Sequence, residues 1–234
     1  MAITYDAVKP WGRSFSEYVG MFGLTETDLH GRIIGCGDGP ASFNAEATAL
    51  GYQVTSVDPI YALTPLQIEQ RIHETWEQIV EQMRQNMDMF VWTKFKSLDD
   101  VRDTRLRAMR RFIADLEQGQ QEGRYIDASL PDLPFADSSF DLALCSNFLF
   151  MYSDNLSTAF HIAAVQEMGR VAREVRIFPL YDLANKESDH VIPVMEFMQA
   201  QGWQVARVPV DYEFLRGANQ MLRLTPSTDQ GPQT

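Results

Sequence analysis

The chain has 234 residues, of which 45% are hydrophobic and 22% charged, a composition typical of a globular protein that buries a sizeable core. Its formal net charge of −12 excludes broad binding to a nucleic-acid backbone, although it allows a local basic patch. Two cysteines cannot build a disulfide framework, no apolar run approaches the length of a membrane span, and residues 1–10 lack the pattern of a signal peptide. We therefore expect a cytoplasmic protein that binds neither membranes nor nucleic acid.

A capping box opens the first predicted helix. Ser14 and Glu17 lie three residues apart, so each side chain can accept a hydrogen bond from the backbone N–H of the other. Gly23 is typical of the residue that ends such a helix, and residues 25–29 predict one further turn. The elements that follow are a strand over 32–35, a helix over 40–50 closed by Gly51, and a strand over 53–57. This alternation predicts a βαβ unit with a parallel sheet.

The alternation then stops between residues 61 and 123. Thr64, followed by a proline, begins one predicted helix, and Ser97 begins another. Apolar residues recur at steps of three and four along the first helix, so they share one face. We interpret 61–123 as a helical insertion that acts as a lid over a pocket, as a packing or homodimer element, or as both. A run of arginines in it predicts a solvated face, with binding of an anionic substrate as the alternative; these are Arg102, Arg105, Arg107, Arg110 and Arg111.

Strands resume after the insertion. They are expected over 124–127, 140–145, 175–179, 203–208 and 221–224, with helices over 156–173 and 188–201. Only a loop separates the last two strands, which favours antiparallel pairing. Residues 226–234 are polar and are expected to form a disordered tail.

A glycine-rich turn follows the first predicted strand. Residues 32–39 read Arg-Ile-Ile-Gly-Cys-Gly-Asp-Gly, and the second strand ends on Asp58. Glycines let the backbone approach a nucleotide cofactor, and an acid at this place accepts hydrogen bonds from ribose hydroxyls. A dinucleotide fingerprint needs glycine at its sixth position, where Pro40 offers no N–H to a pyrophosphate. The turn therefore favours a nucleotide cofactor other than NAD(P).

Two motifs resemble those of class I S-adenosylmethionine-dependent methyltransferases, of the bacterial small-molecule type similar to methyltransferase domain 11. Gly-Cys-Gly-Asp-Gly over 35–39 resembles their first motif, and Leu-Pro-Phe-Ala-Asp-Ser-Ser-Phe-Asp over 133–141 resembles the segment that introduces their fourth strand. The resemblance covers roughly 31–224 apart from the insertion. It implies an α/β fold with a Rossmann-like, seven-stranded, mostly parallel sheet, an antiparallel C-terminal strand pair and helices on both faces. We expect one domain over 1–225, with the insertion at 61–123 placed after strand 2.

The resemblance also implies which residues bind the cofactor, which would be S-adenosylmethionine with S-adenosylhomocysteine as product. Position by position, these residues are Gly35, Cys36 and Gly37 below the methionine and ribose, Asp58 at the ribose hydroxyls, Pro59 and Ile60 against the adenine, Ser129 and the Leu130 amide at the adenine edge, and Asn147 at the methionine portion. Asp127 is the alternative at the adenine edge.

One position departs from the family pattern. The family carries an acid two residues before the first motif glycine, where this chain has Ile33. Backbone carbonyls near Gly35 and Asn147 would then hold the ammonium of the cofactor. Arg13 would pair with the cofactor carboxylate, because a guanidinium suits bidentate contacts, or it is a solvated surface charge.

The methyl acceptor is expected beyond the carboxyl ends of the fourth and fifth strands. Phe148, Tyr152 and Tyr181 would line its pocket, which favours a small apolar or aromatic molecule. Because the methyl carbon of a sulfonium is already electrophilic, the chain mainly has to hold a nucleophile in line, about 3 Å away, and exclude water. The candidates for a general base are Tyr152, Tyr181 and His73, and the sequence assigns none of them.

Two other functions share this fold. An NAD(P)-linked oxidoreductase has the same βαβ cradle, but Pro40 and the final strand pair speak against it. A non-catalytic module would keep the fold for protein binding, which Ile33 favours. Cys36 and Cys145 end neighbouring strands, but no histidine or acid stands at metal-ligand spacing from them, so no metal is expected.

Overall fold

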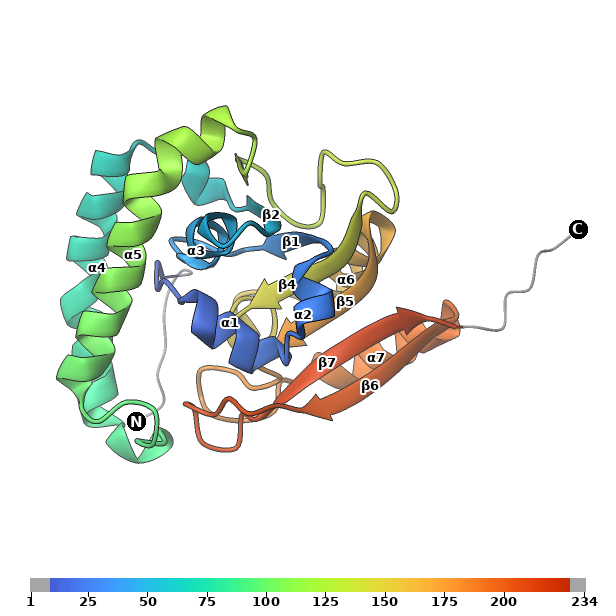
Figure 1. The fold of residues 1–234 in the computed structure, drawn as a ribbon. Helices are drawn as coiled ribbons and strands as arrows, with labels where there is room; N and C mark the ends of the chain where they lie inside the picture. Colours follow the sequence, from blue (N-terminus) through green and yellow to red (C-terminus); the bar gives the residue numbers. More distant parts are fainter. Residues whose placement is uncertain (1–8, 228–234) are drawn as a thin grey trace, which may run out of the picture.

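The structure, a computed structural model, describes residues 9–227 and is built around one seven-stranded sheet (Figure 1). The strand order is β3-β2-β1-β4-β5-β7-β6, with parallel pairing from β3 to β5 and antiparallel pairing of β7 with both β5 and β6. The strands are β1 (Arg32–Cys36), β2 (Gln53–Val57), β3 (Tyr125–Ile126), β4 (Phe140–Ser146), β5 (Ala172–Phe178), β6 (Trp203–Pro209) and β7 (Gln220–Pro226). This is the class I methyltransferase fold, as the sequence predicts.

Seven α-helices and three short 3-10 helices accompany the described strands. The α-helices are α1 (Phe15–Phe22), α2 (Glu26–Leu29), α3 (Phe43–Ala49), α4 (Pro65–Gln85), α5 (Leu98–Gln121), α6 (Thr158–Val171) and α7 (Val191–Ala200). The 3-10 helices are η1 (Pro59–Ala62), η2 (Met87–Met89) and η3 (Phe150–Tyr152). Among the described residues, no helix combines the length and the apolar character that crossing a membrane requires.

Alternating side chains of the sheet fill two separate cores. Ile33 points to the face that α1 and α3 cover, and its neighbour Ile34 points to the face that α6 and α7 cover. Both side chains are fully buried. A strand that is buried on both faces reads as a continuous apolar run, which is the pattern seen in β1 and β4.

The helical insertion forms two long helices that pack side by side along one edge of the fold (Figure 1). The capping box at Thr64 and the serine cap at Ser97 begin α4 and α5 where the sequence predicts them. The apolar stripe of α4 is buried within the chain: its residues at 79 and 83 pack in the core that contains Ile33, and those at 68 and 72 pack in a third core with residues of α5. The insertion therefore uses this stripe for packing inside the molecule.

The segment after α4 is tied to the loop between β6 and β7. The backbone N–H of Val91 donates to the carbonyl of Phe214 at 2.8 Å, and the rings of Phe90 and Phe214 stack with centroids 4.9 Å apart. These contacts join the insertion to the far end of the sheet. The insertion, which precedes β3 at one edge of the sheet, therefore reaches the loop that follows β6 at the other edge.

Several element boundaries differ from the sequence expectation, among them the start of α7 at Val191 rather than 188, and two of the differences have a clear tertiary cause. The helix expected from residue 40 begins at Phe43, because the N–H of Ser42 donates to the carbonyl of Arg13 at 2.9 Å and holds the preceding residues in a turn. Strand β5 begins at Ala172 rather than 175, because Ala172 pairs with Phe140 of β4 and so ends α6 early. The expected tail begins inside β7, which runs to Pro226, and residues 228–234 lie outside the described part of the chain.

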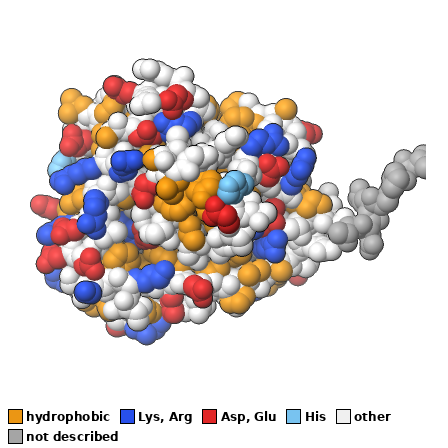
Figure 2. All heavy atoms as spheres, viewed as in Figure 1, with side chains coloured by type: hydrophobic (Ala, Val, Ile, Leu, Met, Phe, Trp, Pro, Cys, Tyr) orange, Lys and Arg blue, Asp and Glu red, His pale blue; other side chains and the backbone are white. Residues whose placement is uncertain are grey.

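Charges of both signs are interspersed on the face of the molecule shown in Figure 2. Lysine and arginine side chains alternate there with aspartate and glutamate. This face therefore offers no broad basic surface of the kind that binds a phosphate backbone.

Candidate active site

A cavity of ≈ 560 Å³ lies over the carboxyl ends of the strands, from the turns after β1 and β2 to the segments after β5 and β6. This volume is in the range of small-molecule sites, about 300–1,000 Å³. Of the residues that the sequence singles out, those that line it are Arg13, Gly37, Asp58, Pro59, Ile60, Ser129, Leu130, Asn147, Phe148 and Tyr152. Gly35, Cys36, Asp127, His73 and Tyr181 are not part of its wall.

The glycine turn after β1 needs its glycines for conformation and for space. Gly37 and Gly39 have φ angles of 71° and 54°, in the left-handed region that favours glycine. A Cβ atom on Gly37 would lie 2.8 Å from Cδ1 of Phe148, closer than side chains pack. The turn therefore presents bare backbone to the cavity, with the Phe148 ring lying against it.

Asp58 caps the turn that follows β2 and is fixed by two backbone donors. Its Oδ2 accepts from the N–H of Gly39 at 2.8 Å, and its Oδ1 accepts from the N–H of Ile60 at 2.8 Å. Burial raises the pKa of Asp58 above its usual value, while these two donors oppose the shift. A carboxylate has about four acceptor positions, so it can still accept hydrogen bonds from a ligand in the cavity.

Asp38 is a functional candidate that the sequence analysis missed. Its Oδ1 accepts from the hydroxyl of Tyr18 and its Oδ2 from that of Ser56, both at 2.7 Å. The carboxylate folds back over Gly35, where it fills the space that a side chain on that glycine would need. It is 7% exposed, it lines the cavity, and burial raises its pKa to about 6.

Asn147 follows β4 and has a φ of 53°, a conformation that non-glycine residues rarely adopt and that asparagine tolerates best. Its backbone N–H donates to the carbonyl of Phe178 at 2.7 Å, and its Nδ2 donates to Oγ of Ser146 at 2.8 Å. Its Oδ1 accepts from Nη2 of Arg13 at 3.1 Å. Unusual backbone conformations gather at functional sites, and this one directs the amide toward the cavity.

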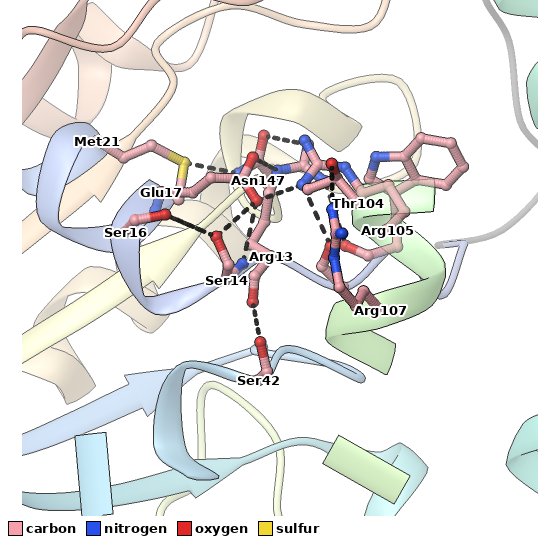
Figure 3. A network of polar contacts seen from close by, with 12 residues as sticks. Arg13, Ser14, Ser16, Glu17, Met21, Ser42, Thr104, Arg105, Arg107 and Asn147 are labelled. Atoms are coloured by element: carbon pink, nitrogen blue, oxygen red, sulfur yellow. Dashed lines mark hydrogen bonds and ion pairs between the residues drawn. The ribbon is translucent and has the colours of Figure 1, made fainter. Parts of the chain in front are cut away.

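Two arginines share one carboxylate beside the cavity (Figure 3). Arg105 of α5 is fully buried and forms an ion pair with Glu17 of α1, and Nε of Arg13 lies 4.0 Å from Oε1 of the same glutamate. Although burial alone would raise it, the two guanidinium groups hold the pKa of Glu17 at about 2. Burial, followed by the charge of Arg105, lowers the pKa of Arg13 to about 10.

This cluster keeps an excess of positive charge. Nε of Arg13 and Nε and Nη2 of Arg105 are buried without a hydrogen-bond partner in the described structure. Arg13 lines the cavity, so an anionic group of a ligand could complete its hydrogen bonds. The expectation that the arginines of the insertion form a solvated face is wrong for Arg105, because Glu17 draws its side chain inward.

Of the three candidate bases, Tyr152 is the one that lines the cavity. Tyr152 lines the cavity and its hydroxyl accepts from the backbone N–H of Lys9 at 3.0 Å, while burial raises its pKa. The backbone of Tyr181 instead forms an antiparallel β-bridge with Glu187, and its side chain is not part of the cavity wall. Leu183, two residues later, does line the cavity. His73 is exposed on α4, between the wall residues Arg71 and Thr75.

The residues of the cavity fit the cofactor that the motifs imply. The glycine turn gives backbone access, Asp58 is a fixed carboxylate for hydroxyl groups, and Pro59 and Ile60 are apolar wall residues for a base. At the other end of the turn, Asp38 offers a buried negative charge and Arg13 a buried positive charge with an unpaired N–H. These charges are complementary to an amino-acid group.

The fold and this site define a class I S-adenosylmethionine-dependent methyltransferase, and residues 103–174 match the family model of a methyltransferase domain. The uncharacterized protein MJ0045 of Methanocaldococcus jannaschii is 34% identical over 212 residues, which cover 90% of this chain and 93% of that protein. The chain belongs to the same family as that protein.

Two solved structures of similar fold have low sequence identity to this chain. Magnesium protoporphyrin IX methyltransferase (ChlM) from Synechocystis PCC 6803, with bound S-adenosylhomocysteine, is 11% identical with a TM-score of 0.47, over 86% of this chain and 77% of that chain. The pyocyanin biosynthetic protein PhzM is 13% identical with a TM-score of 0.47, over 91% of this chain and 54% of that chain.

Proposed function

We propose that this chain transfers the methyl group of S-adenosylmethionine to a small apolar or aromatic acceptor. The observation that carries this proposal is the continuity of the cavity, which joins the glycine turn after β1 to an apolar wall after β5 and β6. When bound, the cofactor supplies a methyl carbon that is electrophilic because it is attached to a sulfonium. The chain has to bind both molecules, orient them and exclude water.

The nucleoside part of the cofactor is assigned to the β2 side of the cavity. Asp58 would accept hydrogen bonds from both ribose hydroxyls through its remaining lone pairs. Pro59 and Ile60 would lie against the adenine, with Ser129 and the amide of Leu130 at its edge; all four line the cavity. Gly37 and Gly39 would give the backbone approach that the ligand needs.

The amino-acid part of the cofactor is assigned to two buried charges. The carboxylate of Asp38 lies on the same face of β1 as Ile33, two residues farther toward the cavity, where it covers Gly35. It would therefore hold the ammonium group in place of the acid that the family carries at position 33. Arg13 would pair with the cofactor carboxylate, which would complete the hydrogen bonds of its guanidinium and offset the charge of Arg105.

Helix α4 is assigned the role of a lid over the acceptor. Its residues Arg71, Thr75, Ile79 and Met83 line the cavity, and Trp76 stacks on Trp11 of the N-terminal segment with ring centroids 5.2 Å apart. A homodimer through the insertion stays a prediction, and the acceptor itself is a small molecule in this proposal.

The assignment of Asp38 can be tested with two matched ligands. Calorimetry would compare S-adenosylhomocysteine with its analogue that lacks the amino group, using wild type and Asp38→Asn. We expect wild type to prefer the natural ligand at least about tenfold, since a charge-assisted contact is worth about 1.5–3 kcal/mol. The variant should lose this preference while its affinity for the analogue stays the same.

The control is Asp189→Asn, which removes an exposed carboxylate before α7. It should keep the preference of wild type. An equal preference in wild type and Asp38→Asn would contradict the role given to Asp38, and failure of wild type to bind either ligand would contradict the proposed function.

A further inference from the structure

A chain of buried hydrogen bonds leads from the carboxylate of Asp38 to Arg124, the residue before β3. The hydroxyl of Ser56 in β2 donates to Oδ2 of Asp38 at 2.7 Å, and Nδ2 of Asn44 in α3 donates to Oγ of Ser56 at 3.2 Å. Nη1 of Arg124 then donates to Oδ1 of Asn44 at 2.7 Å. Ser56 and Asn44 are each 1% exposed, so solvent does not compete for these hydrogen bonds.

The donors and acceptors around Asn44 fix the direction of each of these bonds. A guanidinium can only donate, so Oδ1 of Asn44 has to face Arg124. Nδ2 of Asn44 also donates to the backbone carbonyls of Val54 and Arg124, both at 3.1 Å. Turning the amide over would place its oxygen against those carbonyls. Because Asn44 donates to the oxygen of Ser56, the single hydroxyl proton of Ser56 is left for Asp38.

Arg124 is held in turn by the end of the insertion. Its Nη1 and Nη2 donate to the two carboxylate oxygens of Asp115 in α5, at 2.7 and 3.0 Å. Its Nε donates to Glu122, the residue that follows α5, at 2.7 Å. The orientation of Asn44, and with it that of the Ser56 hydroxyl, therefore depends on the C-terminal end of α5.

Asp38 needs such donors, because its hydrogen-bond partners in the described part of the chain include no cation. They are the hydroxyls of Tyr18 and Ser56. Hydrogen bonds that a carboxylate accepts favour its ionised form and so oppose the effect of burial. Neither Ser56 nor Asn44 is part of the cavity wall, so each can affect a ligand there only through Asp38.

We propose that Ser56, oriented by Asn44, is a positioning residue for the cofactor, because its hydroxyl holds the carboxylate of Asp38 ionised over Gly35 for the ammonium group. This inference rests on the proposed function and concerns how its ammonium site stays charged. If Asp38 took up a proton, it would be neutral and would lose its attraction for that group. The chain of hydrogen bonds thus links the cofactor site to the insertion.

The other titratable groups that face Asp38 leave its titration readable. Four of them stay neutral between about pH 5 and pH 8, because burial raises the pKa of each; they are Tyr18, Cys36, Tyr61 and Cys145. The fifth is Asp58, whose pKa burial also raises. Asp58 is assigned to the ribose, so its titration cancels when two ligands with the same ribose are compared.

Calorimetry between about pH 5 and pH 8 tests this inference, with S-adenosylhomocysteine and its analogue that lacks the amino group. Burial raises the pKa of Asp38 to about 6, so the preference of wild type for S-adenosylhomocysteine should fall as the pH drops through this value. We expect Ser56→Ala to move the midpoint of this fall upward by about one pH unit, since a hydrogen bond to a charged group is lost.

A second variant and a control separate this role from a structural one. Asn44→Asp should also raise the midpoint, because the Ser56 hydroxyl could then donate to the new carboxylate instead of to Asp38. The control Thr55→Val removes the hydroxyl of the neighbouring residue in β2 and should keep the midpoint of wild type. Where one of the two test variants does not fold, the other decides.

An unchanged midpoint in Ser56→Ala or in Asn44→Asp would overturn the inference. An equal loss of affinity for both ligands at every pH would also overturn it, since this result indicates a structural role. Wild type that binds both ligands equally would contradict the role of Asp38, and the inference with it. If wild type binds neither ligand, the proposed function itself fails, so the failures are distinguishable.

Discussion

At the scale of single residues, the buried carboxylate of Asp38 gives the site its most unusual electrostatic feature. It has two neutral hydroxyl donors, from Tyr18 and Ser56, where buried carboxylates usually have a cation. Its pKa is raised from 3.8 to about 6 by burial. Its charged form lowers the stability of the protein without ligand, and it is complementary to a ligand that brings a positive charge.

This feature predicts a pH dependence of stability. The pKa of Asp38 is higher in the fold than in the unfolded chain, so folding takes up a proton between pH 3.8 and about 6. The contribution of Asp38 to the free energy of unfolding therefore falls as the pH rises through this window, by an amount on the order of 3 kcal/mol. We expect Asp38→Asn to be more stable than wild type at pH 8, by about 1–3 kcal/mol, and to lose this advantage near pH 4.

Urea unfolding of both proteins at the two pH values measures this difference. Other carboxylates, such as Glu17, titrate in the same way in both proteins and cancel in the comparison. A variant that is less stable than wild type at pH 8 would show that the two hydroxyl contacts outweigh the burial of the charge.

The turn after β1 gives a second prediction at this scale. Alanine at Gly37 or at Gly23 forces a side chain into the left-handed region, since their φ angles are 71° and 55°, and each should cost about 1–2 kcal/mol of stability. A Cβ at Gly23 meets nothing within 4 Å, whereas one at Gly37 would displace the ring of Phe148. We expect Gly37→Ala alone to weaken binding of S-adenosylhomocysteine, by more than tenfold in calorimetry.

Equal affinities for S-adenosylhomocysteine in the two glycine variants would mean that the ligand does not use the turn. Thermal unfolding would measure the stability that each variant loses, so that a loss of affinity can be distinguished from a loss of stability.

The sequence predicts site residues well where a residue directly follows a strand. Asp58 and Asn147 both occupy such positions, and parallel strands bring their carboxyl ends to one edge. Asp38 and Arg105 were missed because their positions depend on partners far away in the chain, Tyr18 and Glu17. No local pattern distinguishes a carboxylate or guanidinium that turns inward from one that faces water.

At the scale of elements, local signals and tertiary pairing decide different things. The capping boxes at Ser14 and Thr64 fix where α1 and α4 begin, and both appear where the sequence predicts them. The start of β5 was misplaced by three residues, because the pairing of Ala172 with Phe140 competes with the helical propensity of the segment. Caps can be read from a few neighbouring residues, whereas strand pairing cannot.

The insertion gives the prediction at this scale. Helix α5 is anchored to the body by the ion pair of Arg105 with Glu17, and α4 lies outside it with four residues on the cavity. If α4 acts as a lid, its backbone amides between 71 and 83 should exchange hydrogen more slowly once S-adenosylhomocysteine and an acceptor are bound. Hydrogen–deuterium exchange followed by mass spectrometry would measure these rates, with the amides of α7 as the internal control.

Unchanged exchange in α4, with both ligands bound, would assign the insertion to packing alone. Slower exchange in α7 to the same extent would indicate a general gain in stability rather than closure of a lid.

At the scale of the whole molecule, the order of strands and helices was predictable because the hydrophobic pattern is strong. Strands β1 and β4 are nearly continuous apolar runs, and the loop between the last two strands allows only antiparallel pairing. The contact between the insertion and the β6–β7 loop was not predictable, because Phe90 and Phe214 are far apart in the chain. That contact places the rings of Phe90 and Phe214 in the apolar part of the cavity wall.

The central claim is that one cavity binds an S-adenosyl cofactor through Asp58 and the glycine turn. Calorimetric titration of wild type and Asp58→Ala with S-adenosylhomocysteine and, separately, with NAD tests it most directly. We expect wild type to bind one S-adenosylhomocysteine per chain, Asp58→Ala to bind it at least about tenfold more weakly, and NAD to give no binding heat. Binding of NAD without binding of S-adenosylhomocysteine, or an Asp58→Ala variant with the affinity of wild type, would contradict the claim.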